Sequence, residues 1–259
     1  MRLPRLPFAR RGRAPATPLP GLPEVEGTLY VVGDLHGCSA LLDRMLGRIE
    51  ADAWDRDGPS TLVFVGDYVD RGEDSKGVLE RLAALPAQEG ARRHVFVRGN
   101  HEEALLRFLS DPLGGRDWLE WGGVQTLASF GVDPVLSSAP DGALRGVSAA
   151  LRRAMGPLVR WLEEVPVLMH REGNVVACHA GMVPDLPPEG QPRQALLWGS
   201  RRFMERGGPP GLWVVHGHTI VDEAQVIGNR IAVDTGAYDT GTLSAAAIGR
   251  DGMTFLTVS

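Results

Sequence analysis

The sequence is poor in the residues that disulfide-linked and membrane-spanning proteins require. Cys38 and Cys178 are the only cysteines in 259 residues, which is too few for a disulfide framework and favours a reducing cytoplasm. The longest apolar runs, such as Thr61 to Val65, have the length of a strand, whereas a bilayer span requires roughly 20 apolar residues. We therefore expect a cytoplasmic protein without a membrane partner.

Lysine is also scarce, because Lys76 is the only lysine among 27 Lys and Arg residues. This bias is more simply a matter of composition than of mechanism, and it carries no functional information. The formal net charge is −5, although residues 1–23 contain arginines and no acid. The rest of the chain is therefore more acidic than the total indicates, which argues against general nucleic-acid binding.

The N-terminal segment is rich in proline and arginine. Prolines recur through Pro23, and they lack the N–H group that helices and sheets need. No apolar stretch follows the arginines, so the segment differs from a secretory signal. We predict a disordered tail over residues 1–26, either a dispensable extension or an arm for a partner or anionic surface, and a single domain over residues 27–259.

From Thr28 onward, short apolar runs end in Gly-Asp or Gly-Asn and are followed by apolar residues at helical spacing. The runs Leu29 to Val32, Leu62 to Val65 and Val95 to Val97 show this arrangement. It predicts repeated β-turn-α units. Open α/β sheets bind ligands at the carboxyl ends of their strands, which is where these polar residues fall.

The second half of the chain has a different pattern. Residues at about 111–164 are predicted to form a helical cap, and a β-hairpin follows across Arg171 to Asn174. Further short strands continue to the C-terminus, with tight-turn signals at Gly228-Asn229 and Asp251-Gly252. Parallel units followed by a strand-rich half predict an α/β fold of two packed mixed sheets flanked by helices.

Five short strings carry the residues suited to chemistry. They are Gly33-Asp34-Leu35-His36-Gly37, Gly66-Asp67-Tyr68-Val69-Asp70-Arg71-Gly72, Gly99-Asn100-His101-Glu102, His179-Ala180-Gly181 and Gly217-His218-Thr219. Together they supply carboxylates, an amide oxygen and imidazoles, which suit Mn²⁺, Fe or Zn²⁺. Each string alone is a weak signal, and the set of five indicates a metal centre.

In this order and spacing the strings resemble the phosphoprotein phosphatase branch of the binuclear metallophosphoesterases. The resemblance implies a four-layer αββα sandwich, the calcineurin-like metallophosphoesterase fold, and two divalent ions, with Mn²⁺ favoured. It further implies that Asp67 bridges the ions, that Asp34 and His36 hold one of them, and that the other ion is held by Asn100, His179 and His218. A central carboxylate can bridge ions roughly 3.5 to 4 Å apart, which agrees with this assignment.

The same resemblance implies the remaining catalytic roles. His101 would be the general acid and Asp70 would orient it, while a metal-activated water attacks phosphorus. Arg71 and Arg98 would bind phosphate oxygens with forked donors, a task that suits arginine better than lysine.

Several assignments have competitors. His216 competes with His218 as a ligand, although Gly217-His218-Thr219 matches the family string. Relatives carry a phosphate-binding arginine soon after a tryptophan equivalent to Trp198, so Arg201 is the candidate here, with Arg202 beside it.

Two further pairs of residues have both a functional and a structural interpretation. Trp118 and Trp121 either shape a substrate rim or pack in the cap. Cys38 and Cys178 are predicted to be inert packing residues, and a redox switch is the alternative.

We predict hydrolysis of phosphomonoesters on serine or threonine of a phosphorylated protein or peptide, with phosphotyrosine as a further substrate. The enzymatic alternative is a symmetrical dinucleoside tetraphosphate hydrolase, whose family often lacks the second aspartate and ends its Asn-His string in Asp. Asp70 and Glu102 therefore favour the protein phosphatase. An inactive module that binds phosphoproteins is disfavoured, because no predicted ligand or acid is missing.

Overall fold

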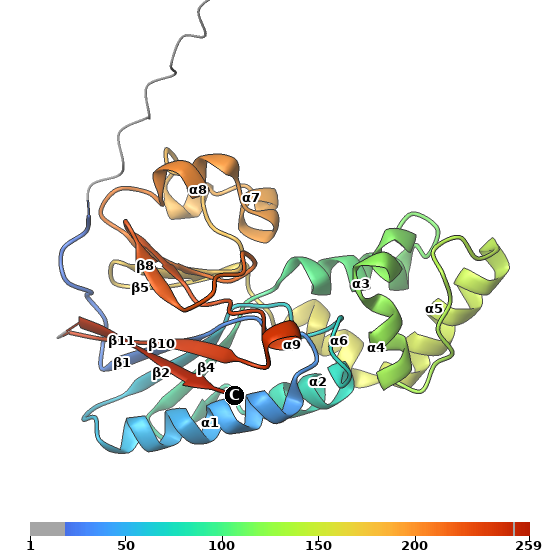
Figure 1. Cartoon of the computed structure of the whole chain (residues 1–259), viewed down its shortest axis with the longest axis horizontal. Helices are drawn as coiled ribbons and strands as arrows, with labels where there is room; N and C mark the ends of the chain where they lie inside the picture. Colours follow the sequence, from blue (N-terminus) through green and yellow to red (C-terminus); the bar gives the residue numbers. More distant parts are fainter. Residues whose placement is uncertain (1–18, 251) are drawn as a thin grey trace, which may run out of the picture.

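The computed structural model describes residues 19–250 and 252–259, and its centre consists of two sheets (Figure 1). The strands of the first sheet are β1 (Thr28–Val32), β2 (Ser60–Phe64), β3 (Gln88–Glu89), β4 (Arg92–Phe96), β10 (Leu243–Gly249) and β11 (Gly252–Val258). Those of the second are β5 (Met169–Glu172), β6 (Val175–Cys178), β7 (Trp213–His216), β8 (Gln225–Ile227) and β9 (Arg230–Ala232). The strand orders are β11-β10-β1-β2-β4-β3 and β5-β6-β7-β9-β8.

Each sheet has a parallel centre with antiparallel strands at its margins. In the first sheet β1 pairs in parallel with β2, and β2 with β4, while β10 runs antiparallel to β1. In the second sheet β6 pairs in parallel with β7, and β7 with β9. The carboxyl ends of each parallel set therefore open onto one edge of its sheet, as the β-turn-α pattern predicted.

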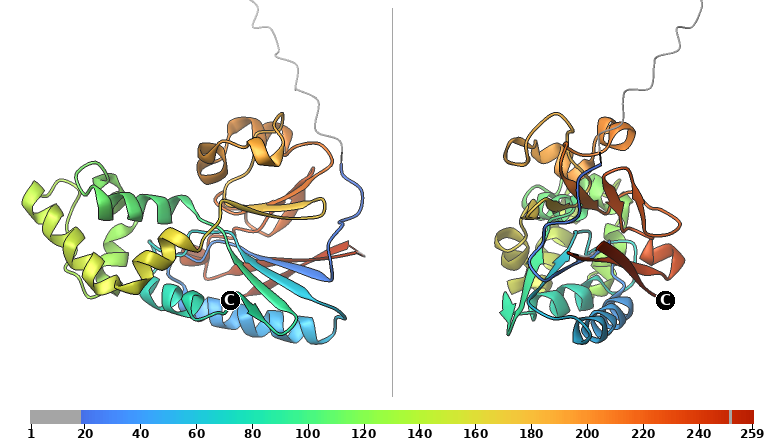
Figure 2. Two further views of the ribbon diagram at one scale, coloured as in Figure 1. Left: turned by 180° about the vertical axis from the view of Figure 1, so that it is seen from behind. Right: turned by 90° about the vertical axis from the view of Figure 1, so that its left-hand side faces the viewer.

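Helices cover the outer faces of the sheets and extend beyond one end of them (Figures 1 and 2). The helices along the first sheet are α1 (Ser39–Trp54) and α2 (Ser75–Ala83). The extension contains α3 (Asn100–Ser110), η1 (Arg116–Trp121), α4 (Gly123–Ser129), α5 (Asp141–Met155) and α6 (Pro157–Glu164). Those nearest the second sheet are η2 (Pro188–Gly190), α7 (Arg193–Trp198) and α8 (Arg201–Arg206), and α9 (Ala237–Thr240) lies between β9 and β10 in the chain. Helices thus fill the predicted cap at residues 111–164.

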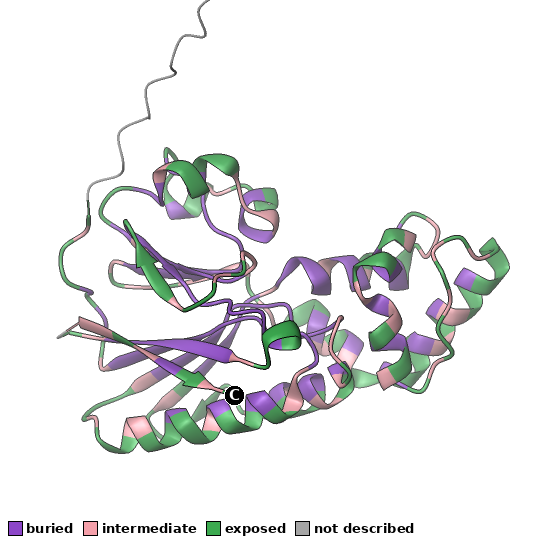
Figure 3. Cartoon of the chain, viewed as in Figure 1, coloured by how far each residue is buried: buried purple, intermediate pink, exposed green. Residues whose placement is uncertain are grey.

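The core shows why the sheets stack face to face. Along β1, Tyr30 and Val32 belong to the cluster beneath the helices, whereas Leu29 and Val31 belong to the cluster between the sheets. All four side chains are fully buried, and Figure 3 shows the buried strands in purple. Strands buried on both faces read as continuous apolar runs. A third cluster, which includes Phe203 of α8, lies under the second sheet, and the result is four layers.

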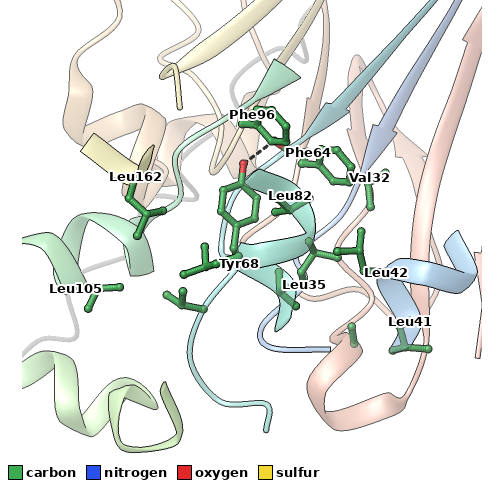
Figure 4. Close-up of a cluster of buried hydrophobic side chains, with 14 of the residues drawn as sticks. Val32, Leu35, Leu41, Leu42, Phe64, Tyr68, Leu82, Phe96, Leu105 and Leu162 are labelled. Atoms are coloured by element: carbon green, nitrogen blue, oxygen red, sulfur yellow. Dashed lines mark hydrogen bonds between the residues drawn. The ribbon is translucent and has the colours of Figure 1, made fainter. Parts of the chain in front are cut away.

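Tyr68 anchors the segment that follows β2 (Figure 4). Its ring is fully buried near Phe64, Leu105 and Leu162, which come from the sheet and the cap. Its hydroxyl donates to the Phe64 carbonyl at 3.3 Å. This anchor fixes the backbone next to Asp67, so the core directly positions the candidate site.

The predicted tail over residues 1–26 was too long. Residues 1–18 lie outside the described residues, but the chain from Gly21 onward contacts the second sheet. Asn174 donates to the Leu22 carbonyl at 3.0 Å and accepts from the Glu24 N–H at 2.8 Å, and Val25 is buried. We name residues 21–26 the N-terminal strap. The proline pattern concealed it, because its hydrogen bonds go to side chains and not to a ladder.

Candidate metal centre

The predicted ligands meet where the carboxyl ends of both parallel sets converge. Asp67 follows β2, Asn100 begins α3 after β4, and His179 follows β6. The two sheets are tied together here, because Asp34 after β1 accepts the backbone N–H of His218 after β7 at 2.9 Å. Sequence segments far apart in the chain thus form one buried cluster.

Asp67 is shared by two groups of candidate metal donors. One group contains His36, Asp67 and His101, and the other contains Asp67, His179 and His218. Within each group the donor atoms lie within 4.8 Å of one another. The two carboxylate oxygens face opposite partners, since Oδ2 lies 3.5 Å from His36 Nε2 and Oδ1 lies 3.4 Å from His179 Nε2. The carboxylate therefore presents one oxygen to each donor group.

Asn100 completes the second group. Its side-chain oxygen lies 2.8 Å from His179 Nε2 and 2.9 Å from His218 Nδ1. An amide oxygen between two imidazoles offers three neutral donors to a single point. The predicted set of Asn100, His179 and His218 is therefore brought together beside Asp67.

Asp34 behaves differently from the other predicted ligands. It lies outside both three-donor groups, and its Oδ1 atom is buried with no hydrogen-bond partner among the described residues. Burial, Asp234 and Asp67 raise the pKa of Asp34 well above its usual range. A buried carboxylate oxygen without a partner costs free energy unless something charged or polar meets it, which fits a cation beside it.

The protonation states also suit a metal. Burial raises the pKa of Asp67, but His179, His101 and His36 outweigh it and hold that pKa well below its usual range. Burial lowers the pKa of His36 to about 3 and that of His179 to about 4. Ligands must be deprotonated to bind metal, so at neutral pH these donors are in the form that coordinates.

The backbone at the centre is unusual. The non-glycine residues with left-handed φ among the described residues are His36, Asp67, Asp70, Arg71 and His218. Such conformations cost of order 1–3 kcal/mol each and persist where the surroundings enforce them. All five are residues that the sequence analysis assigned to the site, so the strain is concentrated at the centre.

His101 is held by a buried carboxylate. Its Nδ1 atom lies 2.7 Å from Asp70 Oδ2, and Nε2 lies 3.9 Å from Asp67 Oδ2. Burial lowers the pKa of His101, but Asp67 and Asp70 outweigh this and raise it to about 9. Around neutral pH the imidazole therefore carries a proton that it can donate.

Asp70 is itself fixed by the cap. The Trp118 indole N–H donates to Oδ2 at 2.8 Å, and the Thr126 hydroxyl donates to Oδ1 at 2.6 Å. Trp118 is only 1% exposed. The structural reading of Trp118 is thus supported, and the residue also reaches the centre through Asp70.

Arg71 lies next to His101 at the surface of the centre. Its Nη2 atom is 3.3 Å from His101 Nε2, and its Nη1 atom donates to the Tyr238 hydroxyl at 3.1 Å. The guanidinium also lies over the Tyr238 ring, 4.9 Å from its centroid. The sequence analysis did not anticipate Tyr238, because no string marks it.

The other two predicted arginines are not brought to the cluster. The Arg98 guanidinium donates to the Leu162 and Glu163 carbonyls at 2.6 and 2.9 Å, which ties β4 to the end of α6. Arg201 is exposed and pairs with Glu205 at 2.7 Å. Local partners thus engage both side chains in this structure, and the phosphate contacts of Arg98 and Arg201 stay predictions.

His216 takes a structural place. Its ring is buried and packs edge-on against Phe203, with centroids 5.0 Å apart. The donor groups contain His218 and not His216. Cys38 and Cys178 are free cysteines, and burial raises both pKa values, that of Cys178 to about 12. A raised pKa disfavours the reactive thiolate, in keeping with the packing interpretation.

Glu102 and Asp234 add two buried acids to the neighbourhood. Glu102 accepts the backbone N–H groups of Asp67 and Gly99 at 2.9 and 2.8 Å and of Tyr68 at 2.7 Å. It thereby ties the loop after β2 to the start of α3. Burial raises the pKa of Asp234 to about 6. Glu102 thus supports the loops that carry Asp67 and Asn100, whereas Asp234 accepts the Gly236 N–H at 2.9 Å.

A profile of the family described as calcineurin-like phosphoesterase matches residues 27–222. The chain belongs to the calcineurin-like phosphoesterase family. This family binds divalent metals with His and Asp clusters of the kind found here, and its fold confirms the predicted four-layer α/β architecture.

No helix among the described residues is long and apolar enough to cross a membrane.

This calcineurin-like phosphoesterase has relatives that match most of its length. It is 26% identical over 235 residues to the asymmetrical bis(5'-nucleosyl)-tetraphosphatase PrpE of Oceanobacillus iheyensis, which covers 83% of this chain and 86% of the relative. It is 33% identical over 159 residues to a symmetrical bis(5'-nucleosyl)-tetraphosphatase of Legionella pneumophila, a match that covers 60% of this chain and 45% of the relative.

Solved structures share the fold at low identity. A proposed diadenosine tetraphosphatase has a TM-score of 0.58 at 24% identity and covers 94% of this chain and 99% of its own. A protein tyrosine phosphatase of a psychrophilic Shewanella species has a TM-score of 0.55 at 15% identity, with 95% and 83% covered. At these identities the likeness establishes the fold and leaves the substrate to other arguments.

Proposed function

We propose that the protein is a metal-dependent hydrolase of dinucleoside tetraphosphates. The observation that carries the proposal is that relatives matching 83% of this chain are named as bis(5'-nucleosyl)-tetraphosphatases. The metal centre supports phosphoester hydrolysis in general. The substrate class of the alternative weighed in the sequence analysis, a dinucleoside tetraphosphate, is thus preferred to a phosphoprotein, and the phosphatases among the structural neighbours share only the fold.

The two residues that favoured a protein phosphatase do not discriminate between substrates. Asp70 holds His101 at 2.7 Å, and Glu102 ties together two loops through hydrogen bonds of 2.7 to 2.9 Å. Neither contact involves a feature that depends on the group esterified to phosphate. Both residues serve any phosphoester that this centre cleaves.

The donors divide into two sites that share one residue. Asp67 would belong to both metal sites. Asp34 and His36 would complete one of them, and Asn100, His179 and His218 would complete the other. Carboxylate, amide and imidazole donors suit Mn²⁺, which we take as the working ion. Divalent ions at these donors supply Lewis acidity toward the phosphoryl group and acidify water.

The protein's own groups complete the chemistry. His101, held by Asp70, donates its proton to the oxygen of the departing group as the phosphorus–oxygen bond breaks. Arg71 presents forked donors beside His101 and binds phosphoryl oxygens, and Tyr238 holds the guanidinium in place. No residue within this arrangement needs to form a covalent bond to phosphorus.

The test compares substrates for the full chain with added Mn²⁺, and with a chelator as control. Diadenosine tetraphosphate, a phosphoserine peptide and p-nitrophenyl phosphate are assayed in parallel. We expect kcat/KM for the dinucleotide to exceed that for the peptide by at least about tenfold, which corresponds to 1.4 kcal/mol of transition-state preference. A higher value for the peptide would restore the protein phosphatase, and no turnover of any substrate would favour the inactive binding module.

Product analysis decides between two cleavage patterns. A nucleoside triphosphate with a monophosphate indicates asymmetrical cleavage, and two diphosphates indicate symmetrical cleavage. We expect the asymmetrical pattern, because the relatives that bear that name match more of the chain.

A further inference from the structure

A groove of about 820 Å³ is lined mainly by α3, η1 and α7. Its lining includes two tryptophans and three charged residues, which are Trp121, Trp198, Glu103, Arg107 and Arg193. Small-molecule sites range over about 300–1,000 Å³. The groove is therefore large enough for a nucleotide-sized ligand, and neither the metal donors nor His101 lines it.

Two tryptophans form a corner in the groove. The Trp121 and Trp198 rings lie 5.4 Å apart between centroids and are inclined at 74°. Trp121 is 38% exposed. Ring faces set nearly at right angles allow a planar group to stack on one indole while its edge meets the other. Stacking of this kind tolerates any nucleobase, because every base has a π-face.

The groove adjoins the arginine assigned to phosphate. Trp121 also lines a second hollow that contains Arg71 and Tyr238. The neighbouring Gly122 carbonyl accepts the Arg71 N–H at 3.3 Å. Trp121 therefore lines both the groove and the hollow that contains Arg71.

The charges in the groove are arranged unevenly. Arg193 pairs with Glu103 through two contacts of 3.2 and 2.6 Å, which joins α7 to α3 and fixes the two walls. Arg107 lines the same groove, and no ion pair engages its guanidinium within residues 19–250 and 252–259. The Arg193–Glu103 pair holds α3 and α7 together, and the charge of Arg107 is available to a ligand. This arrangement suits a polyphosphate that extends from the metal centre into the groove.

We propose that this groove binds the second nucleoside of a dinucleoside tetraphosphate, the one farther from the reacting phosphorus. Its base stacks in the Trp121–Trp198 corner, and Arg107 faces the polyphosphate. The inference rests on the proposed function and names the part of the site that recognises the nucleotide. No strand residue lines the groove, so it offers no strand edge with which an extended peptide could pair.

The test measures a ratio of substrates in tryptophan variants. For Trp198→Ala, the ratio of kcat/KM for diadenosine tetraphosphate to that for p-nitrophenyl phosphate should fall about ten- to a hundredfold, as when a base loses its aromatic partner. Trp198→Phe keeps a ring and should restore the ratio to within about threefold. Arg107→Ala should lower the same ratio. Trp54→Ala, at a side chain 89% exposed and outside the groove, is the matched control and should leave it unchanged.

The outcomes separate the two proposals. If the wild-type chain hydrolyses p-nitrophenyl phosphate but not the dinucleotide, the proposed function fails, and this inference fails with it. If the wild type hydrolyses the dinucleotide and Trp198→Ala leaves the ratio unchanged, only the groove assignment fails. A selective loss on a phosphoserine peptide would assign the groove to a peptide and overturn the nucleoside.

Discussion

The Asp70 carboxylate lies 2.7 Å from His101 Nδ1 and is fully buried. Trp118 and Thr126 of the cap engage its two oxygens. Because each partner donates to a particular oxygen, the carboxylate cannot rotate without breaking a buried hydrogen bond, and the imidazole orientation follows from it. The helical cap thus acts on the metal centre through one aspartate.

His101→Asn tests this arrangement. We expect kcat for a phosphoserine peptide to fall by roughly 10² to 10⁴, the usual contribution of a positioned acid. The loss should be smaller for p-nitrophenyl phosphate and for diadenosine tetraphosphate, because phenolate and phosphate leaving groups depart with less help. Kinetics over a series of leaving groups, with metal content measured in parallel, decide this. An equal loss for every leaving group would assign His101 to binding.

Asp67→Ala tests the bridge. We expect both ions to be lost, because each of the two donor groups contains this carboxylate, and its charge has no substitute there. His179→Ala, which removes a donor from one group only, should retain about one ion per chain. Elemental analysis of folded protein gives the result. One tightly held ion in Asp67→Ala would show that the carboxylate serves a single site.

Arg71→Lys tests the phosphate contact. Lysine keeps the charge but loses the forked donors, so kcat/KM should fall by about tenfold or more on every substrate. If the contact tightens as phosphorus is attacked, kcat falls as well. Arg201→Lys is the matched control, since Arg201 is exposed and pairs with Glu205. Wild-type kinetics for Arg71→Lys would leave Arg71 without a role in phosphate binding.

Much of the metal centre could be predicted from the sequence, because ligands at the carboxyl ends of parallel strands occur in short strings with glycine. Tyr238 could not be predicted, since its contact with Arg71 joins residues 167 positions apart. Arg98 shows the opposite difficulty. It lies two positions before the predicted ligand Asn100, but its side chain donates to the Leu162 and Glu163 carbonyls of α6.

The layered fold was predictable for a similar reason. Both β-turn-α periodicity and the hairpin turns are local signals, and the structure places two-residue Gly-Asn turns between β5 and β6 and between β8 and β9. The N-terminal strap was missed because its partner, Asn174, lies 150 residues from Glu24. A contact between residues so far apart in the chain produces no periodic pattern in the sequence.

The two Gly-Asn turns offer a matched test of the strap. Gly173 and Gly228 both have left-handed φ, of 55° and 63°, so alanine at either position costs about 1–2 kcal/mol. A Cβ at Gly173 would also lie 1.6 Å from the Glu24 carbonyl, whereas one at Gly228 meets open space. We expect Gly173→Ala to lower the free energy of unfolding by about 1–2 kcal/mol more than Gly228→Ala. If urea titrations gave the same loss of unfolding free energy for both variants, the N-terminal strap would not pack tightly against the Gly173 turn.

The last prediction concerns pH and the link between β1 and α1. Asp52 accepts the Tyr30 hydroxyl at 2.7 Å and Arg56 Nε at 2.6 Å. Burial raises the pKa of Asp52, but the bonds from Arg56 and Tyr30 outweigh it and hold that pKa below its usual range. The folded protein therefore binds this proton less readily than the unfolded chain does. The resulting stability is present above the unfolded pKa of about 4 and is lost as the pH falls through the folded pKa.

Asp52→Asn should accordingly reduce the free energy of unfolding more at pH 7 than at pH 3. We expect the difference between the two pH values to be about 1 kcal/mol or less, because the Arg56 pair is partly exposed and solvent screens it. Tyr30→Phe removes one hydrogen-bond donor and keeps the carboxylate. Its reduction of the free energy of unfolding should therefore also be larger at pH 7 than at pH 3, but by a smaller amount. Urea midpoints at pH 7, 5 and 3 provide the comparison. A deficit for Asp52→Asn that stays constant over this range would show that the hydrogen bonds, and not the charge, carry the contribution of Asp52.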